Sequence, residues 1–339
     1  MNIKEVAEKA GVSITTVSRV LNNPDMVSEK TRERILSVMN ELNYTPNWFA
    51  RNLQNNRTNV IGMLVPDTLE QSNMEIAKGV EKIARQHKCN IILCNTGFDI
   101  NVEREHISTL VQRNTDGIIL TSSALESEDI SRLKNQKLPF VMIEKNKHLE
   151  NENMVYTDYD TASEEAVRHL IDMGRKHIAI ILSQHPETIN EEKLTGYRRA
   201  LAAGHLAFDE RMIMTSENTI EGGFIATSRL LESSSPPDAI FIASDTMAFG
   251  AIERMKQDDL TPDQLAIVGF DDLKTGAVVE PKLTTVTKPS YRMGLTAARL
   301  LFDIIEDNSL MDDTQSIILK SRLKIRKSCG NKERLKEIW

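Results

Sequence analysis

One stretch near the N-terminus, IKEVAEKAGVSITTVSRVLN, constrains the fold of this chain more than any other. Val6, Ala7 and Ala10 recur at helical spacing and predict a first short helix with one apolar side. Gly11 follows where the chain must turn sharply, and a positive φ at that point costs glycine little. Ser13 is then suited to cap a second helix. The stretch therefore predicts a helix-turn-helix.

The second helix of this pair is expected to have two different sides. Its buried side holds Val17, Val20 and Leu21. Its opposite side carries groups that suit contact with the base edges and phosphates of DNA. These residues are Ile14, Thr15, Ser18 and Arg19. The alternative interpretation is an ordinary helical hairpin whose polar face is only solvated.

The length and composition indicate a soluble globular protein of several domains. A chain of 339 residues is long enough for two or three domains with cores of their own. Its residues are 40% hydrophobic and 27% charged, which is typical of soluble proteins. No apolar run approaches the roughly 18 residues that cross a bilayer. Charged residues interrupt the N-terminus, so we expect no signal segment and a cytoplasmic location.

Cysteine, histidine and charge give further expectations. Cys89, Cys94 and Cys329 lack the paired spacing of a zinc site, and the seven histidines are scattered. We therefore expect reduced thiols, no metal and no cofactor. The net charge is −7, of which residues 1–60 contribute +2 and the remainder −9. This sign asymmetry fits a small nucleic-acid-binding module on an acidic body.

The first module is expected to end near residue 45. Ser28 can cap a third helix that runs to about Asn43. Its apolar stripe comprises Ile35, Val38, Met39 and Leu42. The step into Pro46 ends this helix, because the residue before proline avoids helical geometry. Asn47 can cap a further short helix, and the polar residues 55–59 are expected to form a linker.

From residue 60 the pattern changes to short apolar strands that alternate with amphipathic helices. Such alternation predicts an α/β fold with parallel sheets covered on both faces. We expect two similar sheets that divide near residues 157–161, and segments near 284–286 and 316–319 that cross again between the lobes. The expected strands are 60–65, 91–94, 117–121, 140–143, 178–182, 239–243 and 266–270. The expected helices lie around 76–86, 161–173, 192–202, 224–231 and 247–257. Ligands of such sheets bind beyond the carboxyl ends of the strands, here in the cleft between the lobes.

Several motifs occur in order along the chain. The head contains VAEKAGVSITTVSRVLN, and the next segment reads Tyr44-Thr45-Pro46-Asn47 followed by Ala50-Arg51-Asn52-Leu53. The body contains DGIIL (116–120), HLIDMGRKHIAII (169–181), GYRRAL (196–201), ASDTMAFGA (243–251), IVGFDD (267–272) and PKLTTV (281–286). From residue 2 to about residue 328 the chain thus resembles the LacI/GalR family of bacterial transcription regulators. Residues 89–122 are most similar to the catabolite control protein A branch of that family.

The resemblance implies a homodimer in which a DNA-binding head precedes a periplasmic-binding-protein-like core. The head would span residues 1–45, the hinge helix and linker 46–58, and the core 59–339. Within the core, the N-lobe would comprise about 59–160 and 290–318. The C-lobe would comprise about 161–289 and 319–330. The last residues, NKERLKEIW, hold too few apolar positions for a coiled coil, so we expect a dimer and not a tetramer.

The resemblance assigns DNA contacts to the second helix and to the hinge. Base reading would fall to Ile14, Thr15 and Arg19, since arginine can grip guanine bidentately and isoleucine can cover a thymine methyl group. The implied phosphate contacts are Ser13, Thr16 and Ser18. The implied hinge contacts are Asn47, Ala50, Arg51 and Leu53. Leu53 matches the leucine that pries open a base step in the minor groove; packing against the body is the alternative.

The resemblance also implies an effector pocket, from which this sequence departs in part. Asp271 matches a position that hydrogen-bonds sugar hydroxyls, and Glu144 matches another acidic pocket position. Lys193 stands where neutral-sugar binders usually have arginine, and Ser244 where many have asparagine. Residues 70–74 lack the aromatic pair that is common there. We expect a singly charged or neutral hydroxylated effector, such as a sugar derivative; a structural role is the alternative for each residue.

These observations predict an effector-controlled repressor of carbohydrate-use genes that binds a palindromic operator. Tyr291 and Arg299 match positions of the catabolite control protein A branch that meet a serine-phosphorylated phosphocarrier protein, so a protein corepressor is the alternative. An enzyme is disfavoured because no glycine-rich phosphate loop and no GxSxG motif is present. A transport-type solute-binding protein is disfavoured by the added head. We expect no contact with a membrane.

Overall fold

The computed structural model describes residues 2–44, 57–149, 151–311 and 313–330. The chain divides into two compact units, Met1–Asn59 and Val60–Trp339, which are described separately. In the described part of the chain no helix is long and apolar enough to cross a membrane.

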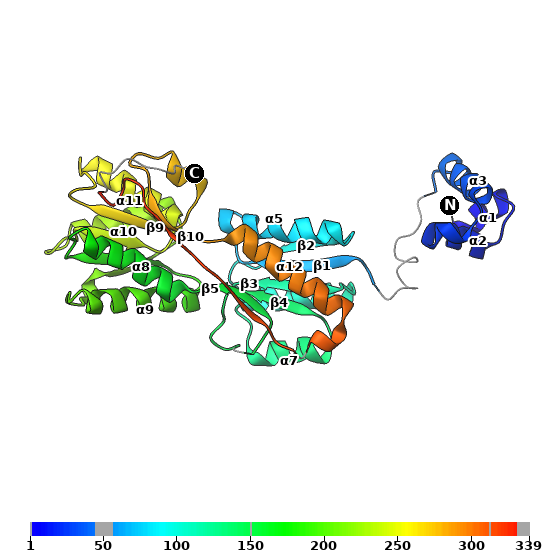
Figure 1. The fold of residues 1–339 in the computed structure, drawn as a ribbon, viewed down its shortest axis with the longest axis horizontal. Helices are drawn as coiled ribbons and strands as arrows, with labels where there is room; N and C mark the ends of the chain where they lie inside the picture. The colour runs from blue at the N-terminus through cyan, green and yellow to red at the C-terminus, as the bar shows by residue number, and fades with distance from the viewer. Residues whose placement is uncertain (1, 45–56, 150, 312, 331–339) are drawn as a thin grey trace. The chain divides into compact units, whose positions relative to one another are not determined.

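The first unit is a small helical head with a helix-turn-helix, as the sequence predicts (Figure 1). Gly11 lies in the turn with φ of +64°. Val6, Val17 and Ile35 are fully buried and join the three helices in one core. The elements are α1 (Ile3–Lys9), α2 (Ile14–Asn22), the 3₁₀ turn η1 (Pro24–Met26) and α3 (Glu29–Glu41). Ser28 precedes α3, but its hydroxyl bonds the Thr31 hydroxyl and no backbone N–H, so the predicted side-chain cap is wrong.

The second unit begins with a parallel sheet in the order β11-β5-β4-β3-β1-β2. Helices α5 and α12 cover one face, and α6 and α7 cover the other (Figure 1). The strands are β1 (Val60–Val65), β2 (Asn90–Asn95), β3 (Gly117–Thr121), β4 (Phe140–Ile143), β5 (Met154–Thr157) and β11 (Ser316–Leu319). The helices are α5 (Gln71–Gln86), α6 (Ile100–Gln112), α7 (Ser127–Asn135) and α12 (Ser290–Glu306), which the 3₁₀ turn η4 (Asn308–Met311) follows.

A second sheet has the order β12-β10-β9-β8-β6-β7, and all its neighbours are parallel except β12 beside β10. The pair α8 and α9 packs on one face and the pair α10 and α11 on the other (Figure 1). The strands are β6 (Ile178–Ser183), β7 (Ile213–Ser216), β8 (Ala239–Ile242), β9 (Ala266–Asp271), β10 (Thr284–Thr287) and β12 (Leu323–Lys324). The helices are α8 (Tyr159–Asp172), α9 (Glu187–Ala203), α10 (Ile220–Leu231) and α11 (Asp245–Gln257), with 3₁₀ turns η2 (Glu210–Met212) and η3 (Lys274–Ala277). The predicted fold class, a helical head followed along the chain by two parallel sheets, is therefore confirmed.

The chain passes between the two sheets after β5, after β10 and after β11. The expected recrossing is confirmed, because β10 belongs to the second sheet and β11 to the first. We call the parts built on the first and second sheets the N-lobe and the C-lobe. Since the segment after β10 leads directly into α12, the lobes are joined by short segments whose ends are fixed in both sheets.

Helices α5 and α12 approach closely because each presents a glycine to the other. A Cβ on Gly294 would lie 2.0 Å from the carbonyl oxygen of Ile76. A Cβ on Gly79 would lie 2.3 Å from the carbonyl oxygen of Tyr291. No larger residue fits at either position without parting the helices.

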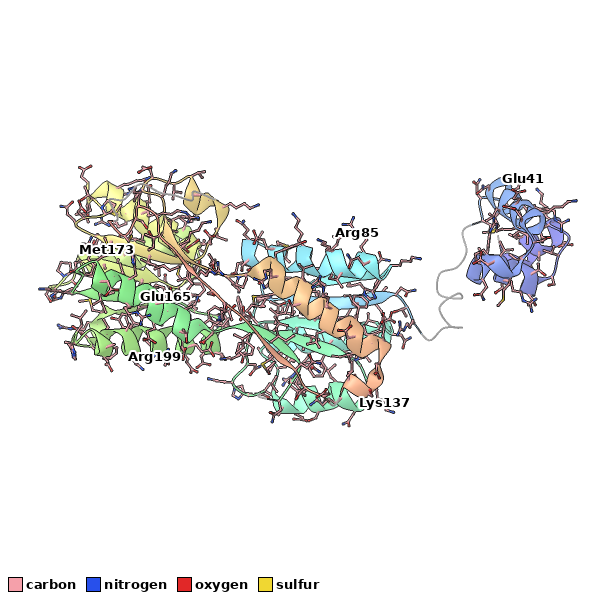
Figure 2. The ribbon with its side chains drawn as sticks, viewed as in Figure 1. Glu41, Arg85, Lys137, Glu165, Met173 and Arg199 are labelled. Carbon is pink, nitrogen blue, oxygen red and sulfur yellow. The ribbon has the colours of Figure 1, made fainter. Side chains whose placement is uncertain are left out.

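Side chains on the surface link neighbouring helices by ion pairs. Arg199 on α9 reaches Asp160 and Glu164 on α8, and Lys9 reaches Glu41 within the head at 2.6 Å. Figure 2 shows Arg199 and Glu41 at the surface. Such exposed pairs add little to stability, so the buried apolar clusters hold each lobe together.

Candidate functional site

Helix α2 begins with a well-formed cap that fixes its first turn. The Ser13 hydroxyl accepts a hydrogen bond from the Thr16 backbone N–H at 3.1 Å. The Ser13 and Thr16 hydroxyls also lie 2.8 Å apart and share a hydrogen bond. The predicted cap is thereby confirmed. It holds two hydroxyl groups at the start of a helix, where the positive end of the helix dipole favours a phosphate.

The side of α2 that faces away from the head's core is accessible. Ile14 is 43% exposed although it is apolar, and Thr15 and Arg19 are also exposed. Thr16 and Ser18 are half-buried. An exposed β-branched residue beside a guanidinium is a surface that can cover a thymine methyl group and bond a guanine. The four predicted hinge residues, Asn47, Ala50, Arg51 and Leu53, lie outside the described residues.

A small, partly open cavity lies where the carboxyl ends of strands from both sheets meet. Its volume is about 40 Å³, far below the roughly 300 Å³ at which complete ligand sites begin. The residues that line it come from loops after β1, β2, β3, β6, β7, β8, β9 and β10 and from α5, α8 and α9. They are Pro66, Glu70, Asn73, Phe98, Ser122, Tyr159, Ser183, His185, Pro186, Ile189, Lys193, Asn218, Ala243, Ser244, Asp271 and Lys288. We call it the cleft cavity.

Lys193 extends from α9 into the cleft cavity and is only 5% exposed. Its ammonium donates to the Ala243 carbonyl oxygen at 2.6 Å and lies 4.0 Å from the centre of the Phe270 ring. Burial lowers the pKa of Lys193 to about 8, with the charge of Lys288 acting in the same direction and that of Asp271 opposing it. Lys193 is thus a buried cation that is held by a carbonyl and an aromatic face.

Asp271 ends β9 with its backbone at φ of 115°, a region that side-chain-bearing residues rarely adopt. Burial raises the pKa of its carboxyl to about 7, while Lys193 and Lys288 oppose that rise. Within the described chain its carboxylate has no hydrogen bond or ion pair. A strained residue with a free acceptor in a cavity is a candidate ligand contact.

Ser244 and Glu144 have different positions relative to the cleft cavity. Ser244 lines it and caps α11 by accepting from the Thr246 backbone N–H at 3.1 Å. Glu144 follows β4 and is not among the residues that line the cavity, so its role as an effector contact stays a prediction. It is 1% exposed, and its Oε1 accepts from the Tyr159 hydroxyl at 2.5 Å and pairs with the Lys288 ammonium at 3.0 Å.

Lys288 is a lining residue that the sequence interpretation missed. It follows β10 by one residue, at the point where the chain leaves the C-lobe for α12. Its backbone N–H donates to the Asp271 carbonyl oxygen at 3.4 Å while its ammonium reaches Glu144. Lys288 could have been predicted as a lining residue from its position at the carboxyl end of a strand, because ligands of such sheets bind there.

Two contacts join the lobes at or near the cleft cavity, which Phe98 and His185 line. The rings of Phe98, after β2, and His185, after β6, stack with centres 5.1 Å apart and planes at 23°. Lys145 after β4 also pairs with Glu192 on α9 at 2.6 Å. No feature of the sequence around Phe98 or His185 indicated that they would meet. Together these contacts place an aromatic pair and an ion pair across the cleft.

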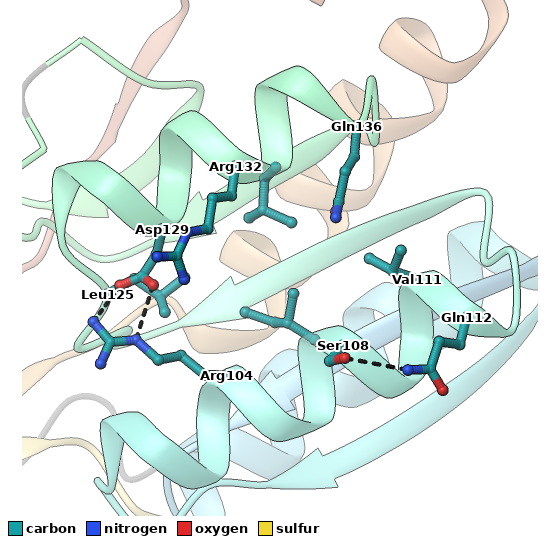
Figure 3. Close-up of a pocket in the computed structure, with 10 residues that line it drawn as sticks. Arg104, Ser108, Val111, Gln112, Leu125, Asp129, Arg132 and Gln136 are labelled. Carbon is teal, nitrogen blue, oxygen red and sulfur yellow. Dashed lines mark hydrogen bonds and ion pairs between the residues drawn. The ribbon is translucent and has the colours of Figure 1, made fainter.

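A separate hollow of about 370 Å³ lies between α6 and α7, away from the cleft (Figure 3). Its apolar lining includes Val111 and Leu125, with Ser108 and Gln112 bonded to one another at its edge. Arg104 crosses between the helices and binds both oxygens of Asp129 at 2.8 Å. Each charged group among these residues already has a partner. The hollow therefore offers fewer groups that could bind a ligand than the cleft cavity does.

Comparison with known proteins agrees with both the head and the core. Residues 2–47 match the family described as "Bacterial regulatory proteins, lacI family". Residues 58–327 match "Periplasmic binding proteins and sugar binding domain of LacI family". The chain belongs to the LacI family. A LacI-family protein with both parts is a DNA-binding transcription regulator and not an enzyme.

Relatives of this LacI-family chain are similar over its whole length. Catabolite control protein A of Priestia megaterium is 34% identical over 97% of this chain and 99% of its own. A solved structure described as a transcriptional regulator CelR–cellobiose complex is 28% identical, with a TM-score of 0.73 over 97% of this chain and 99% of its own. The lac repressor dimer bound to operator and an anti-inducer has a TM-score of 0.86 over 97% of this chain and 99% of its own. At 23% identity that last likeness shows the fold alone.

Proposed function

We propose that this regulator represses carbohydrate-use genes and that a small hydroxylated effector in the cleft cavity changes its affinity for the operator. The observation that carries the proposal is the cavity itself. Asp271, Lys193 and Ser244 converge there from the C-lobe, and polar groups of the N-lobe face them. Acceptors and donors on two opposed walls suit a polyhydroxylated molecule. Since such a regulator acts on bacterial DNA, we place it in the cytoplasm.

The exposed side of α2 would read the operator. Arg19 and Ile14 suit direct contact with base edges, and Thr15 lies between them on the accessible side. Ser13, Thr16 and Ser18 would contact phosphates and set the register of the helix. Such contacts fix orientation without reading sequence. A homodimer would place two such helices on the half-sites of a palindrome.

The hinge would connect effector binding to operator binding. The short hinge helix within residues 46–58 is marginal alone, so it would fold only on DNA beside its dimer mate. Asn47, Ala50 and Arg51 would support it there, and Leu53 would enter the minor groove as a wedge. A change in lobe spacing would alter whether the two hinges can pair.

The effector would bridge the lobes because the two walls of its cavity belong to different sheets. Asp271 can accept hydrogen bonds from vicinal hydroxyls, while Lys193 and Ser244 can donate to ring or hydroxyl oxygens. The structure described as a CelR–cellobiose complex gives one related regulator a sugar ligand. A ligand that binds closed lobes better than open ones shifts the population toward closure.

A serine-phosphorylated phosphocarrier protein is the second candidate as the controlling partner. Arg299 is exposed on α12 and Tyr291 lies half-buried two turns before it. An exposed arginine can pair with a phosphoserine. The similarity to a catabolite control protein A favours this candidate. Binding of the phosphorylated carrier, absent with Arg299→Ala, would support it.

The test of the proposed function has two steps. Fragments of genomic DNA that the full-length protein retains are sequenced, and a palindrome shared by them is expected. A solute-binding protein or an enzyme would retain no preferred sequence. Sugars, sugar phosphates and sugar acids are then screened for a rise in melting temperature, and each hit is added to a gel-shift assay with the selected palindrome. No sequence preference, or hits that leave the gel shift unchanged, would overturn the proposal.

A further inference from the structure

Two buried lysines face the cleft cavity from different elements. Lys193 on α9 is 5% exposed, and the side chain of Lys288, after β10, is 8% exposed. Both ammonium groups lie over the same ring, with Lys193 5.3 Å and Lys288 5.9 Å from the centre of Tyr159. The charge of Lys288 also acts on Lys193, so the two cations influence one another in a space from which water is largely excluded.

The two cations differ in how their charge is balanced. Lys288 has a carboxylate partner in Glu144 at 3.0 Å. Lys193 has one hydrogen bond, to the neutral Ala243 carbonyl, and no carboxylate within ion-pair distance among the described residues. Burying a charge without a paired counter-charge is unfavourable. A ligand that supplies the missing negative charge would offset this cost.

We infer that the effector carries a compact anionic group, a carboxylate or a phosphoryl group, and that this group binds between Lys193 and Lys288. The inference rests on the proposed function, because it names the chemical class of the effector. The hydroxyls of the same molecule face Asp271. A sugar acid or a sugar phosphate fits this description, whereas a neutral sugar leaves the charge of Lys193 unbalanced.

Electrostatics of the surrounding groups agree with this assignment. The charged and titratable groups around Lys193 are Glu70, Glu144, Tyr159, Asp271, His185 and Lys288. Glu144 is engaged by Lys288 and Tyr159, and Glu70 accepts from the Ser72 hydroxyl and the Asn73 amide. Burial raises the pKa of Asp271 to about 7, so that this carboxyl is partly protonated near neutral pH. No carboxylate on the walls thus fully balances Lys193.

The size of the cleft cavity fits the anionic group and not the whole effector. About 40 Å³ holds a carboxylate or phosphoryl group, whereas complete ligand sites usually exceed about 300 Å³. The rest of the molecule requires the stacked Phe98 and His185 rings to separate.

The first test uses inorganic phosphate as the probe, added to the full-length protein at constant ionic strength and pH 7. We expect phosphate to raise the melting temperature of the wild type by about 2 °C more than it raises that of Lys193→Met or Lys288→Met. Lys82→Met, an exposed lysine on α5, is the matched control and keeps the full rise. An equal rise in all four proteins overturns the inference, because it shows general exclusion of phosphate from the surface.

A second measurement uses only the wild-type protein, so it does not require that any variant folds. Burial lowers the pKa of Lys193 to about 8, so the ammonium loses its proton as the pH rises through that value. The phosphate-induced rise of the wild type should therefore shrink between pH 7 and pH 9.5. Phosphate itself gains negative charge over the same range, which would strengthen binding to a permanent cation. A rise that grows with pH overturns the assignment to Lys193.

A matched series of sugars distinguishes a carboxylate from a phosphoryl group in the effector. It also distinguishes failure of this inference from failure of the proposed function. D-glucose, D-glucuronate and D-glucose 6-phosphate differ only at C6, and the corresponding galactose compounds form a second series. A melting shift with the uronates supports a carboxylate, and one with the 6-phosphates supports a phosphoryl group. A shift with the neutral sugars alone overturns the anion inference and leaves the proposed function standing. Loss of coupling to the operator would overturn the proposed function instead.

Discussion

Replacing Tyr159 by phenylalanine should destabilise the larger unit because it removes one buried hydrogen bond and little else. Tyr159 is 2% exposed, and its hydroxyl donates to Glu144 at 2.5 Å. Phenylalanine keeps the ring, whose centre lies 5.4 Å from that of Phe270. The variant therefore isolates the contribution of the hydroxyl group to the carboxylate behind the cleft cavity.

The magnitude follows from the charge of the acceptor. A hydrogen bond to a charged group contributes roughly 1.5–3 kcal/mol, and one between neutral groups roughly 0.5–1.5 kcal/mol. Glu144 keeps its ion pair with Lys288 in the variant, so we expect a loss of about 2 kcal/mol. Tyr197→Phe is the matched control, since its buried hydroxyl donates to the neutral Ile178 carbonyl at 2.7 Å. There we expect about 1 kcal/mol.

Urea unfolding of the full-length proteins, followed by circular dichroism, measures both losses in the larger unit. A lower midpoint with an unchanged slope reports a change in stability alone. The melting temperature of Tyr159→Phe should fall by about 4 °C. If Tyr159→Phe loses no more stability than Tyr197→Phe, then Glu144 is not held as a charged acceptor and the account of the cavity's rear wall is wrong.

Three further substitutions test other parts of the structure. Arg19→Ala should weaken operator binding by about 1–3 kcal/mol and relax specificity at one base pair of each half-site; equal loss on unrelated DNA would show a phosphate contact instead. Gly294→Ala should lower the melting temperature sharply, because its Cβ would meet the Ile76 carbonyl, whereas Gly276→Ala places its Cβ at an ordinary 3.4 Å from the nearest atom. Equal melting temperatures would refute that close approach. Leu53→Ala should reduce operator affinity and bending and leave dimerisation and effector binding intact; unchanged affinity and bending would exclude a wedge.

The strands and the head could be predicted because their signals are local. Continuous apolar runs such as 117–121 and 140–143 match β3 and β4. In the head, the turn glycine and the serine cap of α2 each encode one local geometry. Helices α6 and α7 gave no such signal, since charged residues such as Glu103 and Asp129 occupy their buried sides. Their burial depends on partners that are distant in the sequence.

The cleft could be located from the sequence, but its contacts could not. Carboxyl ends of parallel strands meet at one edge, so Asp271 and Ser244 were expected there. The sequence did not indicate that the Glu144 carboxylate would bind Lys288, because the two residues lie far apart in the sequence. Lys288 and the Phe98–His185 stack depend on how two sheets meet. The hydrophobic pattern of a single segment does not indicate how two sheets will meet.

The most direct test of the account measures operator binding and effector binding in the same protein. Fluorescence anisotropy of the selected operator gives its Kd with and without the effector found by the melting screen. For the wild type and for Asp172→Ala, an exposed carboxylate on α8, we predict a change in Kd of about 5- to 150-fold. For Asp271→Ala we predict the same Kd without effector and no change when effector is added. An equally large change in Asp271→Ala would contradict control through the cleft cavity.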